Sequence, residues 1–190
     1  MKLGKIADLN IGLVLARKKA EEYENNKIEY KSLALKSIDS NGIILEENLE
    51  KFYSKERLND EMLTKFGDVV IRVSEPYTAT YIDSDYEGIV IPVNYAVIRL
   101  KSNKIKPEFL KFYINSKEGK KSILRVCEGT MLKTISIANL KDLSIKVCSI
   151  EKQNQFININ KLAIRENELL NKLISEKSKY LDVLNKELLK

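Results

Sequence analysis

An α+β head of short strands and helices, followed by one long C-terminal helix of coiled-coil type, is the fold class that this sequence predicts. Three observations predict it. Short stretches of alternating apolar and polar residues fill the first hundred residues, without repeating βαβ units. All three prolines and all seven glycines precede residue 130. Apolar positions in the final third recur every three or four places, so we place the head at 1–149 and the helix at 150–190.

The strands expected in the first hundred residues are short, and turn signals separate them. Asn41-Gly42 is a hairpin-turn signal, and Gly67-Asp68 is a turn ahead of a buried strand. Residues 17–26 are polar and tolerate a helix, whereas 74–85 is a loop with three tyrosines close in sequence, counting Tyr86. Alternation predicts strands at 3–15 and 28–33, the apolar run at 69–73 predicts a buried strand, and two further short strands are expected at 88–92 and 95–100.

The pattern changes at Pro107, where a helix is expected to begin. Proline suits a first helical turn, and four apolar residues follow it at helical spacing. This helix should end near Gly119, a loop should follow at 128–130, and 143–147 alternates as a last strand. From Ile150 onward we expect one uninterrupted helix, which at about 1.5 Å per residue would span roughly 58 Å.

The C-terminal helix carries the heptad seam of a coiled coil. Its seam positions follow a 4-3-4-3 spacing: Phe156, Asn160, Ala163, Asn167, Leu170, Ile174, Lys177, Leu181, Leu184 and Leu188. A second apolar stripe beside it indicates contact with more than one helix: Ile159, Leu162, Leu169, Leu173 and Tyr180. The two seam asparagines either fix register or reflect the abundance of asparagine. We expect dimerisation through Leu170, Ile174, Leu181, Leu184 and Leu188.

Composition excludes several function classes. The chain has no histidine, which removes Ser-His and Cys-His catalysis and histidine metal sites but leaves carboxylate and lysine chemistry open. Two cysteines give neither a disulfide framework nor a zinc site, so no metal is expected. We expect a cytoplasmic protein, because no membrane span or signal peptide is recognisable.

Positive charge is concentrated in one part of the chain. Residues 101–150 hold 11 Lys and Arg against 4 Asp and Glu, a net charge of +7, whereas the whole chain has +6. Such a segment is a plausible footprint for nucleic acid. The alternative is that 27 lysines against 6 arginines reflect an AT-rich genome.

Short motifs, taken in order, resemble the specificity subunit of type I restriction–modification systems. The matching segments are 3–8, 67–71, 107–110, 113–116, 129–130, 135–136, 139–143 and 151–153, and their order covers essentially the whole chain. The resemblance implies a non-catalytic target-recognition domain that reads one half of a split site in double-stranded DNA. It also implies a spacer helix that sets the distance between the half-sites and docks adenine-methyltransferase modification subunits. A restriction subunit is a further candidate partner, S-adenosylmethionine and ATP belong to these partners, and no cofactor is expected in this chain.

One departure from that family is large. Its full-length members have two recognition domains and two spacer helices, and this chain has one of each. We therefore expect a homodimer that rebuilds the two-domain arrangement and reads a gapped inverted repeat, because two-fold protein symmetry imposes one. The alternative is a truncated or recombination-cassette fragment.

Three loops are candidates for DNA contact, and all combine cations, hydroxyls or aromatic rings. The basic cluster near the start could equally be a solvated surface, and the third loop corresponds to a family position close to DNA. The candidates are Arg17, Lys18 and Lys19; Arg72, Ser74, Tyr77, Thr78 and Tyr81; and Thr130, Lys133 and Thr134.

Other functions were weighed against DNA recognition. The runner-up is a structural adaptor whose coiled coil joins partners and whose head binds protein. Ser74-Glu75-Pro76-Tyr77 superficially resembles a methyltransferase motif, but it lacks the double proline and a glycine-rich cofactor loop. Glu118-Gly119-Lys120 fits half of a nuclease motif, and no aspartate on a preceding strand completes it.

Overall fold

A computed structural model describes residues 1–21, 26–127 and 134–189, and it divides the chain into two units, Met1–Ile150 and Glu151–Lys190. The first unit is an α+β head, and the second consists of one long helix. The α+β prediction is confirmed.

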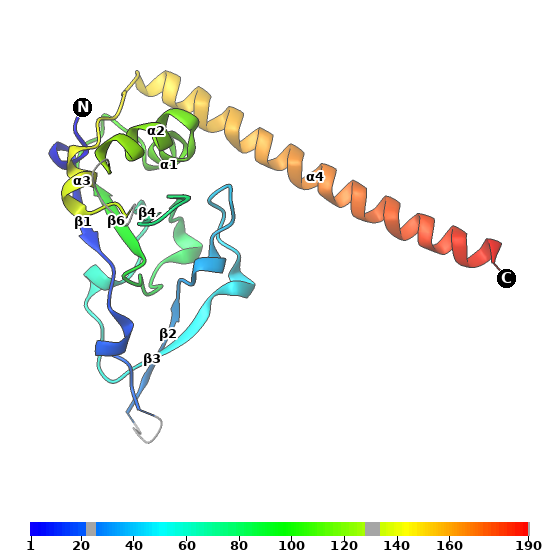
Figure 1. Cartoon of the computed structure of the whole chain (residues 1–190), viewed down its shortest axis with the longest axis horizontal. Helices are drawn as coiled ribbons and strands as arrows, with labels where there is room; N and C mark the ends of the chain where they lie inside the picture. The colour runs from blue at the N-terminus through cyan, green and yellow to red at the C-terminus, as the bar shows by residue number, and fades with distance from the viewer. Residues whose placement is uncertain (22–25, 128–133, 190) are drawn as a thin grey trace. The chain divides into compact units, whose positions relative to one another are not determined.

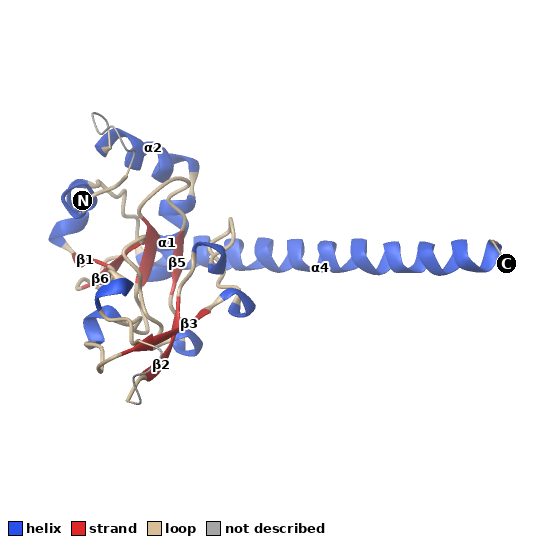
Figure 2. Cartoon of the chain, turned by 60° about the horizontal axis from the view of Figure 1, so that its bottom comes forward, coloured by secondary structure: helices blue, strands red, loops and turns tan. Residues whose placement is uncertain are grey.

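A four-stranded antiparallel sheet lies at the centre of the head, in the order β1-β6-β4-β5. Figure 2 labels its strands β1, β5 and β6. Its strands are β1 (Ala7–Ile11), β4 (Val69–Arg72), β5 (Ala79–Tyr81) and β6 (Tyr95–Leu100). Val69, Val70 and Ile71 of β4 are fully buried, as expected for a central strand without polar alternation. The predicted strand at 3–15 is shorter, because its first residues form a 3-10 turn and the chain leaves the sheet after Ile11.

A second sheet pairs β2 (Ile28–Ser32) with β3 (Glu50–Ser54). Only Phe52 and two serines are buried in this hairpin, so it lies at the surface of the head. The segment 88–92, predicted as a strand, makes only isolated bridges at Val90 and Pro92. Val90 and Ile91 are nevertheless fully buried, which explains the strand-like pattern of the sequence.

Three helices pack together in the head: α1 (Pro107–Asn115), α2 (Lys117–Val126) and α3 (Ile137–Asp142). The single helix expected from Pro107 to Gly119 is in fact two, because Ser116 is extended and its Oγ caps α2 by accepting from the Gly119 N–H. The break needs glycine at 119, since a Cβ there would lie 1.9 Å from the Tyr113 carbonyl oxygen. Figure 1 shows α1 and α2 at one end of the head and β2–β3 at the other.

Short 3-10 helices connect these elements, and none was predicted. They are η1 (Leu3–Lys5), η2 (Leu15–Arg17), η3 (Leu35–Ser37), η4 (Glu46–Asn48), η5 (Asp60–Met62) and η6 (Ser84–Tyr86). The last predicted strand, 143–147, is replaced by backbone bonds to the chain's first residues: the Leu3 N–H donates to Leu143 and the Ile145 N–H to Met1.

The second unit is part of α4 (Ile150–Leu188), a helix of 39 residues, which confirms the long helix expected from the sequence. Leu170, Ile174, Leu181 and Leu188 on its seam are 49–82% exposed in the single chain. Leu184, the fifth predicted dimerisation residue, is partly buried. In the part of the chain that the structure describes, no helix is long and apolar enough to cross a bilayer.

Candidate nucleic-acid interface

The loop between β4 and β5 presents Arg72 and Ser74 at the surface of the head. The Arg72 N–H donates to the Thr78 carbonyl oxygen and closes the base of the loop. The Arg72 Nε donates to Ser74 Oγ at 3.2 Å, and this bond holds the two side chains against each other. Both are partly buried, and the guanidinium has further N–H donors for an outside acceptor.

The shape of this loop is set from inside the protein. Tyr77 is 2% exposed and has a φ of 52°, a left-handed conformation that costs a non-glycine residue about 1–3 kcal/mol. Two carbonyls of the loop, those of Pro76 and Tyr77, accept hydrogen bonds from the Lys120 Nζ on α2. Burial lowers the pKa of the Lys120 ammonium to about 8. Lys120 therefore fixes the loop to α2.

The same loop contacts the segment that precedes α3. The Ile135 N–H donates to the Val73 carbonyl oxygen at 2.8 Å. Thr134 next to it is exposed. A backbone hydrogen bond thus joins the Arg72 loop to the segment that carries Thr134, so two of the predicted loops are adjacent. Thr130 and Lys133, also predicted, lie outside the described residues.

The first predicted loop lies elsewhere. Arg17 ends η2, and Lys19 forms a bridge with Ser54 of β3, at the β2–β3 end of the head (Figure 1). Lys18 pairs with Glu56, which neutralises its charge. Arg17 and Lys19 are exposed, so this cluster is a separate basic surface.

Three residues predicted beside Arg72 are placed differently from our expectation. Tyr77 and Thr78 are only 2% and 6% exposed, so in this structure their side chains lie inside the head. Tyr81 is half-buried and packs edge-on against Phe66, with ring centroids 6.2 Å apart. It pairs with Val69, at the far end of the β4–β5 hairpin from the loop. Nearness in sequence did not bring these side chains together.

A turn that was not among the predicted DNA-contact loops borders this loop. Residues 39–42 form it, and Asp39 and Ser40 join Arg72 and Tyr95 around a recess of about 180 Å³. Asp39 Oδ1 accepts from the backbone N–H groups of Asn41 and Ile43, which holds the turn. Burial raises the pKa of Tyr95 to about 12, and its hydroxyl donates to Ala34. The Asn41-Gly42 signal gave the turn but not its position beside Arg72.

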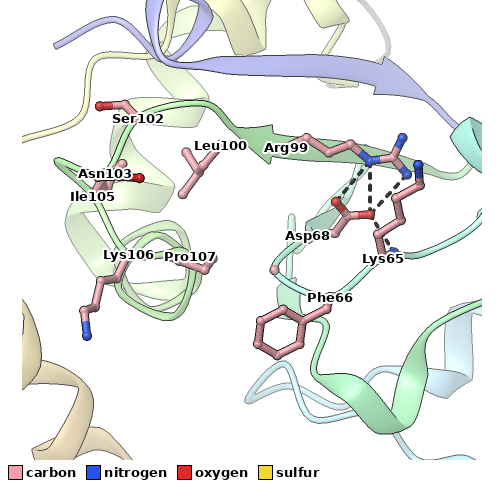
Figure 3. Close-up of a pocket in the computed structure, with 11 residues that line it drawn as sticks. Lys65, Phe66, Asp68, Arg99, Leu100, Ser102, Asn103, Ile105, Lys106 and Pro107 are labelled. Carbon is pink, nitrogen blue, oxygen red and sulfur yellow. Dashed lines mark hydrogen bonds and ion pairs between the residues drawn. The ribbon is translucent and has the colours of Figure 1, made fainter.

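A second recess, of about 510 Å³, lies at the other end of β4 (Figure 3). Phe66 is 63% exposed and points toward it, and Asp68 and Arg99 form an ion pair in its wall (Figure 3). The Arg99 Nε donates to both Asp68 oxygens, at 3.0 and 3.3 Å, and its Nη2 donates to the Leu63 carbonyl oxygen. Burial raises the pKa of Asp68, against the hydrogen bonds from Arg99 that lower it. This pair fixes the turn that enters β4.

The residues of the partial nuclease motif do not converge. The Lys120 Nζ points to the β4–β5 loop, and Glu118 lies 3.6 Å from Lys121 instead. Among the described residues, no three His, Cys, Asp or Glu side chains are grouped as metal ligands would be.

Comparison with known proteins places this geometry in a known fold. No protein-family model and no curated protein matches the chain. Solved structures do: the HsdS subunit from Thermoanaerobacter tengcongensis matches with a TM-score of 0.67 and 16% identity, over 97% of this chain and 46% of that one. The chain has the fold of one half of an HsdS subunit.

Two further solved structures show the same HsdS fold. A second match is to a chain in a structure that addresses complex assembly and conformational transition of the type I restriction–modification system. Its TM-score is 0.64 with 17% identity, and the match covers 97% of this chain and 46% of that one. The S subunit of the type I restriction–modification system of M. genitalium matches with a TM-score of 0.55 and 15% identity, over 93% of this chain and 41% of that one. This chain therefore spans less than half the length of the HsdS-type chains it matches.

Proposed function

We propose that this chain is a non-catalytic DNA-recognition subunit of a type I restriction–modification system. The observation that carries the proposal is the HsdS fold over 97% of the chain, head and long helix included. The motif order in the sequence supports the same assignment independently. The runner-up, an adaptor with a protein-binding head, shares the exposed apolar helix but gives no reason for an HsdS-type head.

The head is proposed to read one half of a split site. Arg72, which donates a hydrogen bond to Ser74, lines the recess together with Asp39 and Ser40. An arginine fork held in this way suits the paired acceptors of a guanine edge or a phosphate. Thr134 adds an exposed hydroxyl that could bind a phosphate of the DNA backbone. Thr130 and Lys133 remain candidates from the same loop, and Arg17 and Lys19 would contact a different part of the DNA.

The long helix is proposed to join two copies of the chain and to set the gap between two half-sites. The exposed seam of α4 supports this pairing. The second apolar stripe is proposed to dock an adenine-methyltransferase modification subunit, with a restriction subunit completing the complex. S-adenosylmethionine and ATP would then act on those partners.

Arg72 provides the first test of this function. Replacing it with alanine should weaken binding of the selected DNA site by about 1–3 kcal/mol if it reads a base, roughly 5- to 150-fold. Arg72→Lys keeps the charge but not the fork, and should recover only the part due to a phosphate. Fluorescence anisotropy at two salt concentrations measures both.

Lys51→Ala is the matched control, because Lys51 is exposed and pairs with Glu29 in the β2–β3 sheet. It should leave affinity unchanged. A wild-type chain that binds no duplex between about 50 and 200 mM salt, the range over which phosphate contacts weaken, would favour the adaptor function instead.

A further inference from the structure

The exposed side of α2 carries a line of three cations that the sequence analysis did not select. Lys117, Lys121 and Arg125 are all exposed and lie four residues apart. Residues at this spacing share one helix face, about 6 Å apart along the axis. Gly119 and Ile123 are buried on the opposite side, against the head.

Among the described residues, the charge of this line has fewer carboxylate partners than that of Lys31 and Lys51. Lys31 and Lys51 of the β2–β3 sheet each lie within 3.0 Å of a glutamate oxygen. On α2, Lys121 lies 3.6 Å from Glu118. Within the described ranges, Lys117 and Arg125 have no carboxylate at ion-pair distance. Cations at i and i+4 repel one another, so this spacing does not stabilise the helix itself.

The line is also adjacent to the proposed reading loop. Lys120, which lies between two of its members in sequence, donates to the Pro76 and Tyr77 carbonyls, so α2 and the Arg72 loop form one rigid surface. We propose that Lys117, Lys121 and Arg125 form a phosphate-binding strip that lies along the DNA backbone while the Arg72 loop faces the bases. The proposal rests on the DNA-recognition function proposed above and adds the residues that position the duplex.

DNA fits this strip better than an acidic protein surface does. Lysine is depleted from protein–protein interfaces, whose centres are apolar, and Leu124 is the one exposed large apolar residue among the described residues of α2. A DNA strand carries one phosphate per about 3.4 Å of duplex axis. Because the strand runs obliquely to that axis, neighbouring phosphates lie further apart than this, and their spacing is comparable with the roughly 6 Å between the cations.

The test is the salt dependence of binding to a random-sequence duplex, which reports phosphate contacts. The triple variant Lys117→Gln, Lys121→Gln, Arg125→Gln should lower the log–log salt slope by about 2.7 for each bound copy, at about 0.9 per contact. Its preference among DNA sequences should not change. The matched control, Lys31→Gln, Lys36→Gln, Lys51→Gln, removes the same charge and should leave the slope unchanged.

A triple variant with the wild-type slope would overturn the strip while leaving the proposed function intact. A wild-type chain without any duplex affinity would overturn both. If the variant keeps the wild-type slope but no longer binds a modification subunit, the strip is a protein contact and the proposal is wrong. Circular dichroism of each variant confirms that the head is folded.

Discussion

Replacing Arg99 with leucine should lower the free energy of unfolding by about 3–5 kcal/mol, because it leaves a buried carboxylate without its partner. The Asp68 side chain is only 3% exposed, and Arg99 donates to both of its oxygens. The substitution also removes the donor to the Leu63 carbonyl oxygen. Urea unfolding followed by circular dichroism measures the loss.

Two variants separate the buried charge from other effects. Adding Asp68→Asn to Arg99→Leu removes that charge and keeps an oxygen for the Lys65 N–H, so part of the stability should return. Lys101→Ala, which breaks the exposed pair with Asp8, should cost less than about 1 kcal/mol. A loss below about 1 kcal/mol for Arg99→Leu as well would contradict the role given to the buried pair.

The second large effect concerns self-association through α4. Leu170→Glu with Ile174→Glu should convert a dimer, of twice 21.9 kDa, into a monomer. Burying unpaired carboxylates in the seam costs several kcal/mol, which weakens association by roughly a thousandfold or more at 1.4 kcal/mol per factor of ten. Light scattering at several concentrations follows the mass.

Lys172→Glu is the control for this variant. It makes the same change in net charge on the opposite face of the helix, and it should leave the dimer intact. A wild-type chain that is monomeric at every concentration would contradict pairing through α4.

The main elements of the fold could be predicted where the sequence pattern is strong. The strands near 28–33, 69–73 and 95–100 and the long helix from Ile150 follow alternating, continuously apolar or heptad patterns, and the structure has all four. β3 was missed because Phe52 is its only buried large apolar residue.

Other elements depend on contacts that a pattern does not contain. α3 has six residues, too few for a helical period, and the cap from Ser136 Oγ to the Asn139 N–H defines its start. The break at Ser116 depends on the close approach of Gly119 to the Tyr113 carbonyl. Residues 143–147 alternate as a strand does, but Leu143 and Ile145 form backbone hydrogen bonds with Leu3 and Met1 and not with a strand of a sheet.

The candidate site was only partly predictable for the same reason. Arg72 and Ser74 could be chosen by residue type, but the inward position of Tyr77 follows from its positive φ and from Lys120. The α2 strip could have been found from its four-residue spacing once a helix was expected there. The position of that helix beside the reading loop required the three-dimensional structure.

The central claim is that two copies of this chain, paired through α4, read a split DNA site. Selection of bound duplexes from a fully randomised pool, followed by sequencing, tests it most directly. We expect one enriched site in which two identical half-sites are inverted and separated by a gap of fixed length. Recovery of a single ungapped half-site, of half-sites at variable distances, or of no enriched sequence would contradict the claim.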